Sequence, residues 1–171
     1  MDAVEPLAAQ RARIDDLEEA FWRRPDGDRL AALQSAWREL ERLIAQRGVD
    51  RRHRFVILIP VADSPVHLEA CLDSLLELCR SFGYGGMRDG LYHKVSVLLA
   101  DDSAGADNIA RHCALAERAR AGGLAVEYFG LEEQRALLDR MTGIALDGVV
   151  GEPAVARGPR KGQGVMRNIA G

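Results

Sequence analysis

The chain has 171 residues, a net charge of −3 and a pI of about 5.8. This balance argues against a dedicated nucleic-acid binder, whose surface is usually basic. Apolar residues make up 47% of the chain, but no apolar run approaches the ~18 residues of a membrane span, and the N-terminus lacks a signal-peptide pattern. Three cysteines do not make a disulfide framework. We therefore expect a cytoplasmic protein with no transmembrane segment and no nucleic-acid partner.

Residues 1–54 predict an antiparallel pair of helices. Each helix carries an apolar stripe at helical spacing, which suits packing against a partner helix. The stripes consist of Leu7, Ile14, Leu17 and Phe21, and of Leu30, Leu33, Trp37, Leu40 and Ile44. Asp26 or Asp28 can cap the second helix, and Gly48 ends it. We interpret this hairpin as a structural extension; the alternative is a dimerisation or docking element, such as a homodimer formed through these helices.

The apolar period changes at residue 55. Residues 55–59 form a continuous β-favouring run that ends at Pro60, typical of a buried parallel strand. A helix then begins at Ser64 and Pro65, with Ser64 as its N-cap. The apolar stripe of that helix includes Cys71 and Cys79, which we expect to be buried thiols. Residues 81–90 are rich in glycine and predict a loop.

The rest of the chain alternates strands and helices. We expect strands over 95–100 and 125–129, helices over 107–120 and 131–145, a loop over 147–164, and a further helix from Val165. This order predicts an α/β fold, with a Rossmann-like parallel sheet and flanking helices after the N-terminal helical hairpin. The expected domains are residues 1–54 and 55–171. Ligands of such sheets bind beyond the carboxyl ends of the strands, here residues 60–63 and 101–103.

Several common site types are missing from these strand ends. The first strand is followed by no glycine turn for a dinucleotide, and the chain has no Walker loop and no G-x-S-x-G elbow. The histidines and cysteines have no zinc spacing, and we interpret each histidine as a surface or internally satisfied residue. Asp101 and Asp102 are adjacent, so one can accept hydrogen bonds from a ribose or base while the other faces a cation or the loop. The alternative is that one of them caps the following turn.

A basic, glycine-bearing segment follows near the C-terminal end. Residues 157–168 contain Arg157, Arg160, Lys161 and Arg167 and no acidic residue. Backbone N–H groups, a helix N-terminus and basic side chains together can hold a phosphate. A solvated basic tail is the alternative.

These segments together resemble the N-terminal, nucleotide-binding half of family-two-type glycosyltransferases with the GT-A fold. Residues 59–63 resemble the family's I-P-x-Y-N, with Ala62 for the aromatic residue and Asp63 for asparagine. Residues 68–75 resemble its L-x-x-x-L-x-S-L, and residues 101–103 its D-D-x-S. Lys161-Gly162 to Arg167-Asn168 keep the spacing of its [RK]-G-x-x-x-A-R-N. The resemblance covers residues 55–171.

The resemblance implies a protein that binds a nucleoside diphosphate sugar, commonly a uridine one, and in its complete form transfers the sugar to an unknown acceptor. The residues it implies for the nucleotide are Pro60, Val61, Asp63, Asp101, Asp102, Ser103, Lys161, Gly162, Arg167 and Asn168. The family holds Mn²⁺ or Mg²⁺ with a D-x-D that comes after its R-N segment, followed by a general base. This chain has no residues in those places, so we expect a truncated donor-binding half with very slow transfer on its own.

Two other classes remain as alternatives. A non-catalytic nucleotide-sugar-binding or interaction module agrees with the missing D-x-D. A receiver-like signalling domain also has an acidic pair after a strand, and Asp147 lies 45 residues after Asp102, at the spacing of its phosphoacceptor. Only 24 residues follow Asp147, however, and a receiver needs two more β-α units there.

Overall fold

The computed structural model describes residues 5–48, 50–141, 158–159 and 161. The chain divides into two compact units, one of Met1–Phe55 and Leu75–Val95, the other of Val56–Ser74 and Ser96–Gly171. The first unit therefore consists of two separate stretches of chain. Among the described helices, none has the length and apolar character needed to cross a membrane.

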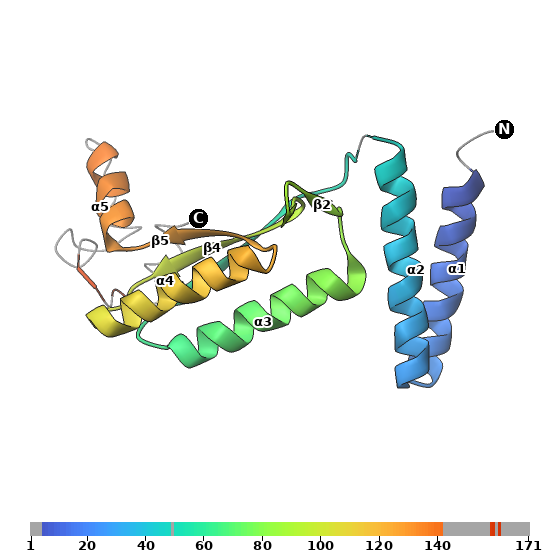
Figure 1. Ribbon diagram of the computed structural model, residues 1–171, viewed down its shortest axis with the longest axis horizontal. Helices are drawn as coiled ribbons and strands as arrows, with labels where there is room; N and C mark the ends of the chain where they lie inside the picture. The colour runs from blue at the N-terminus through green and yellow to red at the C-terminus, as the bar shows by residue number, and fades with distance from the viewer. Residues whose placement is uncertain (1–4, 49, 142–157, 160, 162–171) are drawn as a thin grey trace. The chain divides into compact units, whose positions relative to one another are not determined.

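The first unit contains the predicted helical hairpin. Helices α1 (Glu5–Arg23) and α2 (Gly27–Gln46) pack side by side in opposite directions (Figure 1). Their buried core consists of Ile14, Leu33, Ala36 and Leu40. Asp26 is the N-cap of α2, since its carboxylate accepts a hydrogen bond from the Arg29 N–H at 2.8 Å. The apolar spacing thus predicted this hairpin correctly, although Leu30 at the end of the stripe is 36% exposed.

A short antiparallel ribbon in the first unit corrects the predicted loop over 81–90. Strands β2 (Met87–Arg88) and β3 (Leu91–Tyr92) pair with Met87 opposite Tyr92. The turn between them is Asp89-Gly90, with φ values of 52° and 80°. Two successive positive φ angles are the mark of a type I′ hairpin turn, for which Asp-Gly is a preferred sequence. The sequence therefore carried the signal for this ribbon.

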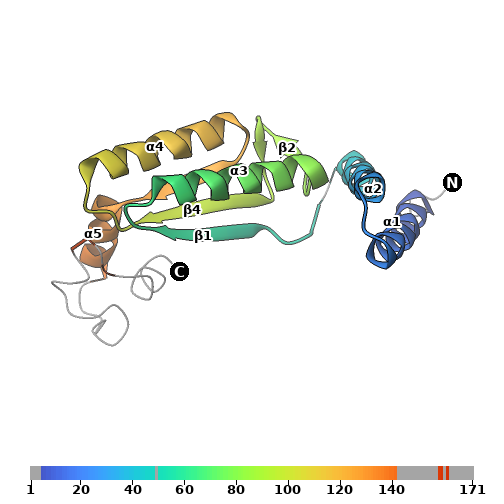
Figure 2. The same cartoon turned by 90° about the horizontal axis from the view of Figure 1, so that it is seen from below.

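The second unit is built on a three-stranded parallel sheet. Strands β1 (Phe55–Val61), β4 (Val95–Asp101) and β5 (Ala125–Phe129) lie in the order β1-β4-β5. β4 and β5 are parallel, with Val97 opposite Val126. Helix α4 (Ala106–Ala121) and the N-terminal part of α3 (Pro65–Phe82) lie over the same face of the sheet (Figure 2). Helix α5 (Leu131–Arg140) follows directly after β5.

These elements confirm the α/β class and the predicted strands and helices between residues 55 and 140. The buried residues of the strands include Val97, Leu99, Ala100 and Val126. Those of the two helices include Leu68, Leu72, Ala116 and Ala119. The rest of the expected helix to 145, the loop over 147–164 apart from residues 158–159 and 161, and the helix from Val165 fall outside the described residues.

Two burial predictions are wrong. β1 is not buried throughout, because it is an edge strand of the described sheet, and Phe55 and Val56 are 53% and 65% exposed. The strand also continues through Pro60, whose missing N–H an edge strand tolerates. In α3, Cys79 is buried but Cys71 is exposed. Cys71 lies on the flank of the stripe, whose buried positions in α3 are Leu68, Leu72, Leu76 and Cys79.

Candidate functional site

The first candidate residue, Asp63, joins the two predicted strand ends. It follows β1 with a φ of 48°, and its backbone N–H donates to Ser103 Oγ at 2.8 Å. Its carboxylate Oδ1 accepts from the Gly105 N–H at 3.1 Å and from Asn108 Nδ2 at 3.2 Å. Gly105 is the N-cap of α4 and has no side chain to offer. Asp63 therefore supplies a negative charge and an acceptor where the helix N-terminus needs both.

Asp101, at the end of β4, is the centre of a buried polar cluster. Its side chain is almost completely buried, and Oδ1 accepts from the Ser103 N–H at 2.9 Å. Oδ2 accepts from the Tyr128 hydroxyl at 2.7 Å and faces His112 Nδ1 at 2.9 Å. Gln134 Nε2 donates to the Asp101 carbonyl at 2.8 Å and ties α5 to the same strand end.

Burial and this cluster affect the acidity of Tyr128. Desolvation raises the pKa of the Tyr128 hydroxyl above its usual value, and the hydrogen bond to Asp101 raises the pKa further. Tyr128 is therefore a neutral donor at physiological pH. Its hydroxyl is held by Asp101 rather than activated as a base.

Ser103, His112 and Asp101 contain the residue types of a catalytic triad but not its geometry. Ser103 Oγ lies 3.4 Å from Nδ1 of His112, and Asp101 approaches the same nitrogen. A triad needs the serine and the carboxylate on opposite ring nitrogens. His112 Nε2 is buried and has no hydrogen-bond partner among the residues that the structure describes. The cluster is thus not arranged for nucleophilic catalysis by Ser103.

Asp102 is joined to the later basic segment by an ion pair. Lys161 Nζ lies 2.9 Å from Asp102 Oδ1 and also donates to the Gly158 carbonyl. The side chain of Lys161 is completely buried. The loss of either partner would leave a buried charge uncompensated, which costs about 3–5 kcal/mol. Gly162, Arg167 and Asn168, and the Asp147 of the receiver alternative, fall outside the described residues.

A cleft of about 350 Å³ opens beside this cluster. It lies where β4 and β5 end and α5 begins. Its lining residues are Asp101, Ser103, Ile109, Tyr128, Gly130, Leu131, Glu132, Glu133 and Arg135. Beyond Asp101 and Ser103, the sequence analysis did not select the residues of this cleft. The sequence did offer one signal for these residues: the third predicted strand ends at the same edge of the sheet as the first two, so the turn after it is also expected near a ligand.

The structure brings together seven of the ten predicted nucleotide residues at one edge of the sheet. Val61 is buried and its carbonyl accepts from the Asp102 N–H at 2.8 Å, while Pro60 precedes it in β1. The same edge carries Asp63, residues 101–103 and Lys161. Within residues 5–48, 50–141, 158–159 and 161, no group of three or more acidic, histidine or cysteine side chains could hold a metal ion. The expected Mn²⁺ or Mg²⁺ stays a prediction for a complete family member.

The fold and this edge define an α/β protein with a parallel sheet whose polar strand ends form a buried cluster. Comparisons with models of protein families, with curated proteins and with solved structures found no match for this chain. The relation to glycosyltransferases therefore depends on the sequence resemblance.

Proposed function

We propose that the carboxyl edge of the sheet binds a nucleoside diphosphate sugar, of the uridine type, as the donor site of a glycosyltransferase-like protein. One observation carries the proposal: Lys161 contacts Asp102 although the two residues are 59 positions apart. Residue 161 of the last segment with the family resemblance is thus a neighbour of the 101–103 segment in space. Asp63 and Ser103 connect the 59–63 segment to the same edge.

The cleft offers suitable chemistry for the nucleoside. Carboxylates such as Glu132 can accept hydrogen bonds from ribose hydroxyls, and the apolar side chains of Ile109 and Leu131 can contact a base. The carboxylate oxygens of Asp101 already contact Ser103, His112 and Tyr128, so Asp101 would position these residues beside the cleft rather than contact the ligand directly. The resemblance implies that basic residues of 157–168 balance the charge of the diphosphate, and Lys161 of that segment lies at this edge.

Donor binding, rather than transfer by this chain alone, is the proposed activity. The leaving diphosphate develops negative charge that a cation or a basic group must stabilise, and the acceptor hydroxyl needs a base. The family places both functions after its R-N segment. The acceptor therefore stays outside the proposal.

Calorimetry with UDP, GDP and UDP- or GDP-sugars, with and without Mn²⁺, tests this function. We expect binding of a uridine nucleotide, and about tenfold weaker binding by Glu132→Gln, because a hydrogen bond to a charged carboxylate becomes a weaker one to a neutral amide oxygen. Glu117→Gln on α4 is the matched control, since it makes the same charge change at an exposed side chain outside the cleft. Equal affinities of the two variants would show that the cleft is not the binding site.

The alternative function is an interaction module that binds no nucleotide. The hydrogen bonds that occupy the Asp101 carboxylate favour it, because a cluster with its polar groups already paired can serve only to stabilise the fold. The same calorimetry distinguishes the two functions, since a complete lack of binding by every nucleotide tested would support the alternative and refute the donor site.

A further inference from the structure

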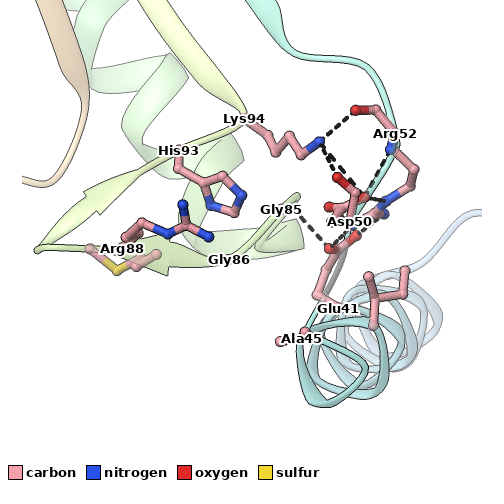
Figure 3. Close-up of a pocket in the computed structure, with 12 residues that line it drawn as sticks. Glu41, Ala45, Asp50, Arg52, Gly85, Gly86, Arg88, His93 and Lys94 are labelled. Carbon is pink, nitrogen blue, oxygen red and sulfur yellow. Dashed lines mark hydrogen bonds and ion pairs between the residues drawn. The ribbon is translucent and has the colours of Figure 1, made fainter.

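A second cavity, of about 340 Å³, lies within the first unit. Its walls are the C-terminal part of α2, the segment around Asp50 and Arg52, the glycine turn before β2, and residues of the ribbon and of its connection to β4 (Figure 3). All of these residues belong to the same compact unit. The cavity is therefore separate from the proposed donor site in the second unit.

One wall of the cavity is fixed by a network of paired charges. Arg52 donates to Glu41 Oε1 at 2.7 Å and to Asp50 Oδ1 at 3.0 Å. Lys94 Nζ donates to the Asp50 carbonyl at 3.0 Å. Glu41 and Lys94 are both buried, and the two cations of this network are balanced by its two carboxylates.

The hydrogen bonds of Arg52 and the positive charges nearby keep Asp50 ionised. The hydrogen bond from Arg52 is the largest cause that lowers the pKa of Asp50 to about 2. The same pairing with Glu41 and Asp50 raises the pKa of Arg52 above its usual value. Asp50 and Arg52 therefore keep their charges across the physiological range.

Two other side chains that line the cavity, those of Arg88 and His93, do not belong to this network of paired charges. Arg88 lines the cavity, is exposed, and makes no ion pair with another described residue. His93 Nδ1 is buried and lacks a hydrogen-bond partner in the part of the chain that the structure describes. A buried polar atom without a partner is costly, and His93 lines the cavity, so a ligand bound there that paired with the His93 ring would offset this cost.

We propose that this cavity binds a small molecule through an oxyanion group, either a phosphate or a carboxylate. Arg88 would donate two parallel hydrogen bonds to the oxyanion, and His93 would donate a third from Nδ1. Arg88 gives the cavity one positive charge more than its two carboxylates balance. The paired wall cannot compete for the anion, because Arg52 and Lys94 already hold their own acceptors.

Titration of the full-length chain with inorganic phosphate and, separately, with sodium acetate tests the site. Long-range ¹H–¹⁵N spectra of the histidine rings report on Nδ1 of His93 directly. We expect its signal to shift on addition of one or both anions, and the stronger of the two identifies the preferred oxyanion. An unchanged His93 signal with both anions would overturn the proposal.

Two arginine variants separate specific binding from general charge effects. Arg88→Ala should weaken the anion affinity at least about tenfold, because the bidentate contact is lost. Arg54→Ala makes the same change in net charge at an exposed residue of the first unit that does not line the cavity, and it should alter the affinity less than twofold. Equal losses in the two variants would refute the site, whatever the second unit binds.

Discussion

Gly85 occupies a position where the backbone leaves no room for a side chain. Its φ is +76°, and a Cβ added there would lie 2.1 Å from Lys94 Cγ and 2.4 Å from Lys94 Cβ. Rotation about the side-chain bonds of Lys94 cannot move its Cβ, which is attached to the backbone. The Gly85 N–H is also held by Glu41 Oε2 at 2.8 Å. The turn therefore cannot shift away without breaking a buried hydrogen bond.

We expect Gly85→Ala to destabilise the first unit by about 2–5 kcal/mol. The left-handed conformation contributes about 1–2 kcal/mol of this loss, and overpacking against Lys94 contributes about 1–3 kcal/mol. Gly86→Ala is the matched control, because Gly86 has a φ of +68° and nothing within 4 Å of its added Cβ. This control should lose only the conformational part.

Urea unfolding followed by tryptophan fluorescence measures the difference between the two variants. Trp37 packs against the hairpin core of the first unit, whereas Trp22 is 76% exposed, so the signal change on unfolding should come mainly from Trp37. The two variants should differ in the free energy of unfolding by the steric part alone. Equal midpoints for Gly85→Ala and Gly86→Ala would refute the argument that contact with Lys94 requires glycine at residue 85.

Two further predictions concern the acidic residues of each unit. The pKa of Asp50 falls from its ordinary value of 3.8 to about 2, mainly through the hydrogen bond from Arg52. Its ionised form therefore stabilises the fold above about pH 4, and about 1–2 kcal/mol of the free energy of unfolding should be lost as the pH falls towards 2. Acid-unfolding curves measure this loss, which Asp50→Asn should abolish. Asp101→Asn replaces an acceptor that serves three donors in a buried cluster. It should cost about 2–4 kcal/mol in thermal unfolding, and a loss below about 0.5 kcal/mol would contradict the role of the cluster.

Local patterns in the sequence were sufficient to predict most of the elements. The stripes of α1 and α2 identify their packing faces because helical spacing is a local property. The apolar run of β4 and the glycines after α4 likewise fix where these elements end. The ribbon turn at Asp89-Gly90 also had its signal in the sequence, although the glycine content of 81–90 led to a loop prediction.

Predictions of burial and of site chemistry needed knowledge of neighbours that the sequence does not provide. Phe55 and Val56 have the composition of a buried strand, but their exposure depends on β1 being at the edge of the described sheet. The position of Asp101 at a strand end could be predicted. The contacts of its Oδ2 with His112 and Tyr128 could not, since these residues come from different elements.

The sequence by itself determined the helical hairpin, the alternation of strands and helices, and the edge of the sheet at which polar side chains gather. Only the tertiary structure decided what those side chains contact. Asp63 supports the start of α4, and Lys161 neutralises Asp102 across 59 residues of chain. The physical reason is that periodicity is encoded by residues a few positions apart, whereas a carboxylate's partner depends on which strand ends and loops the fold brings within about 3 Å.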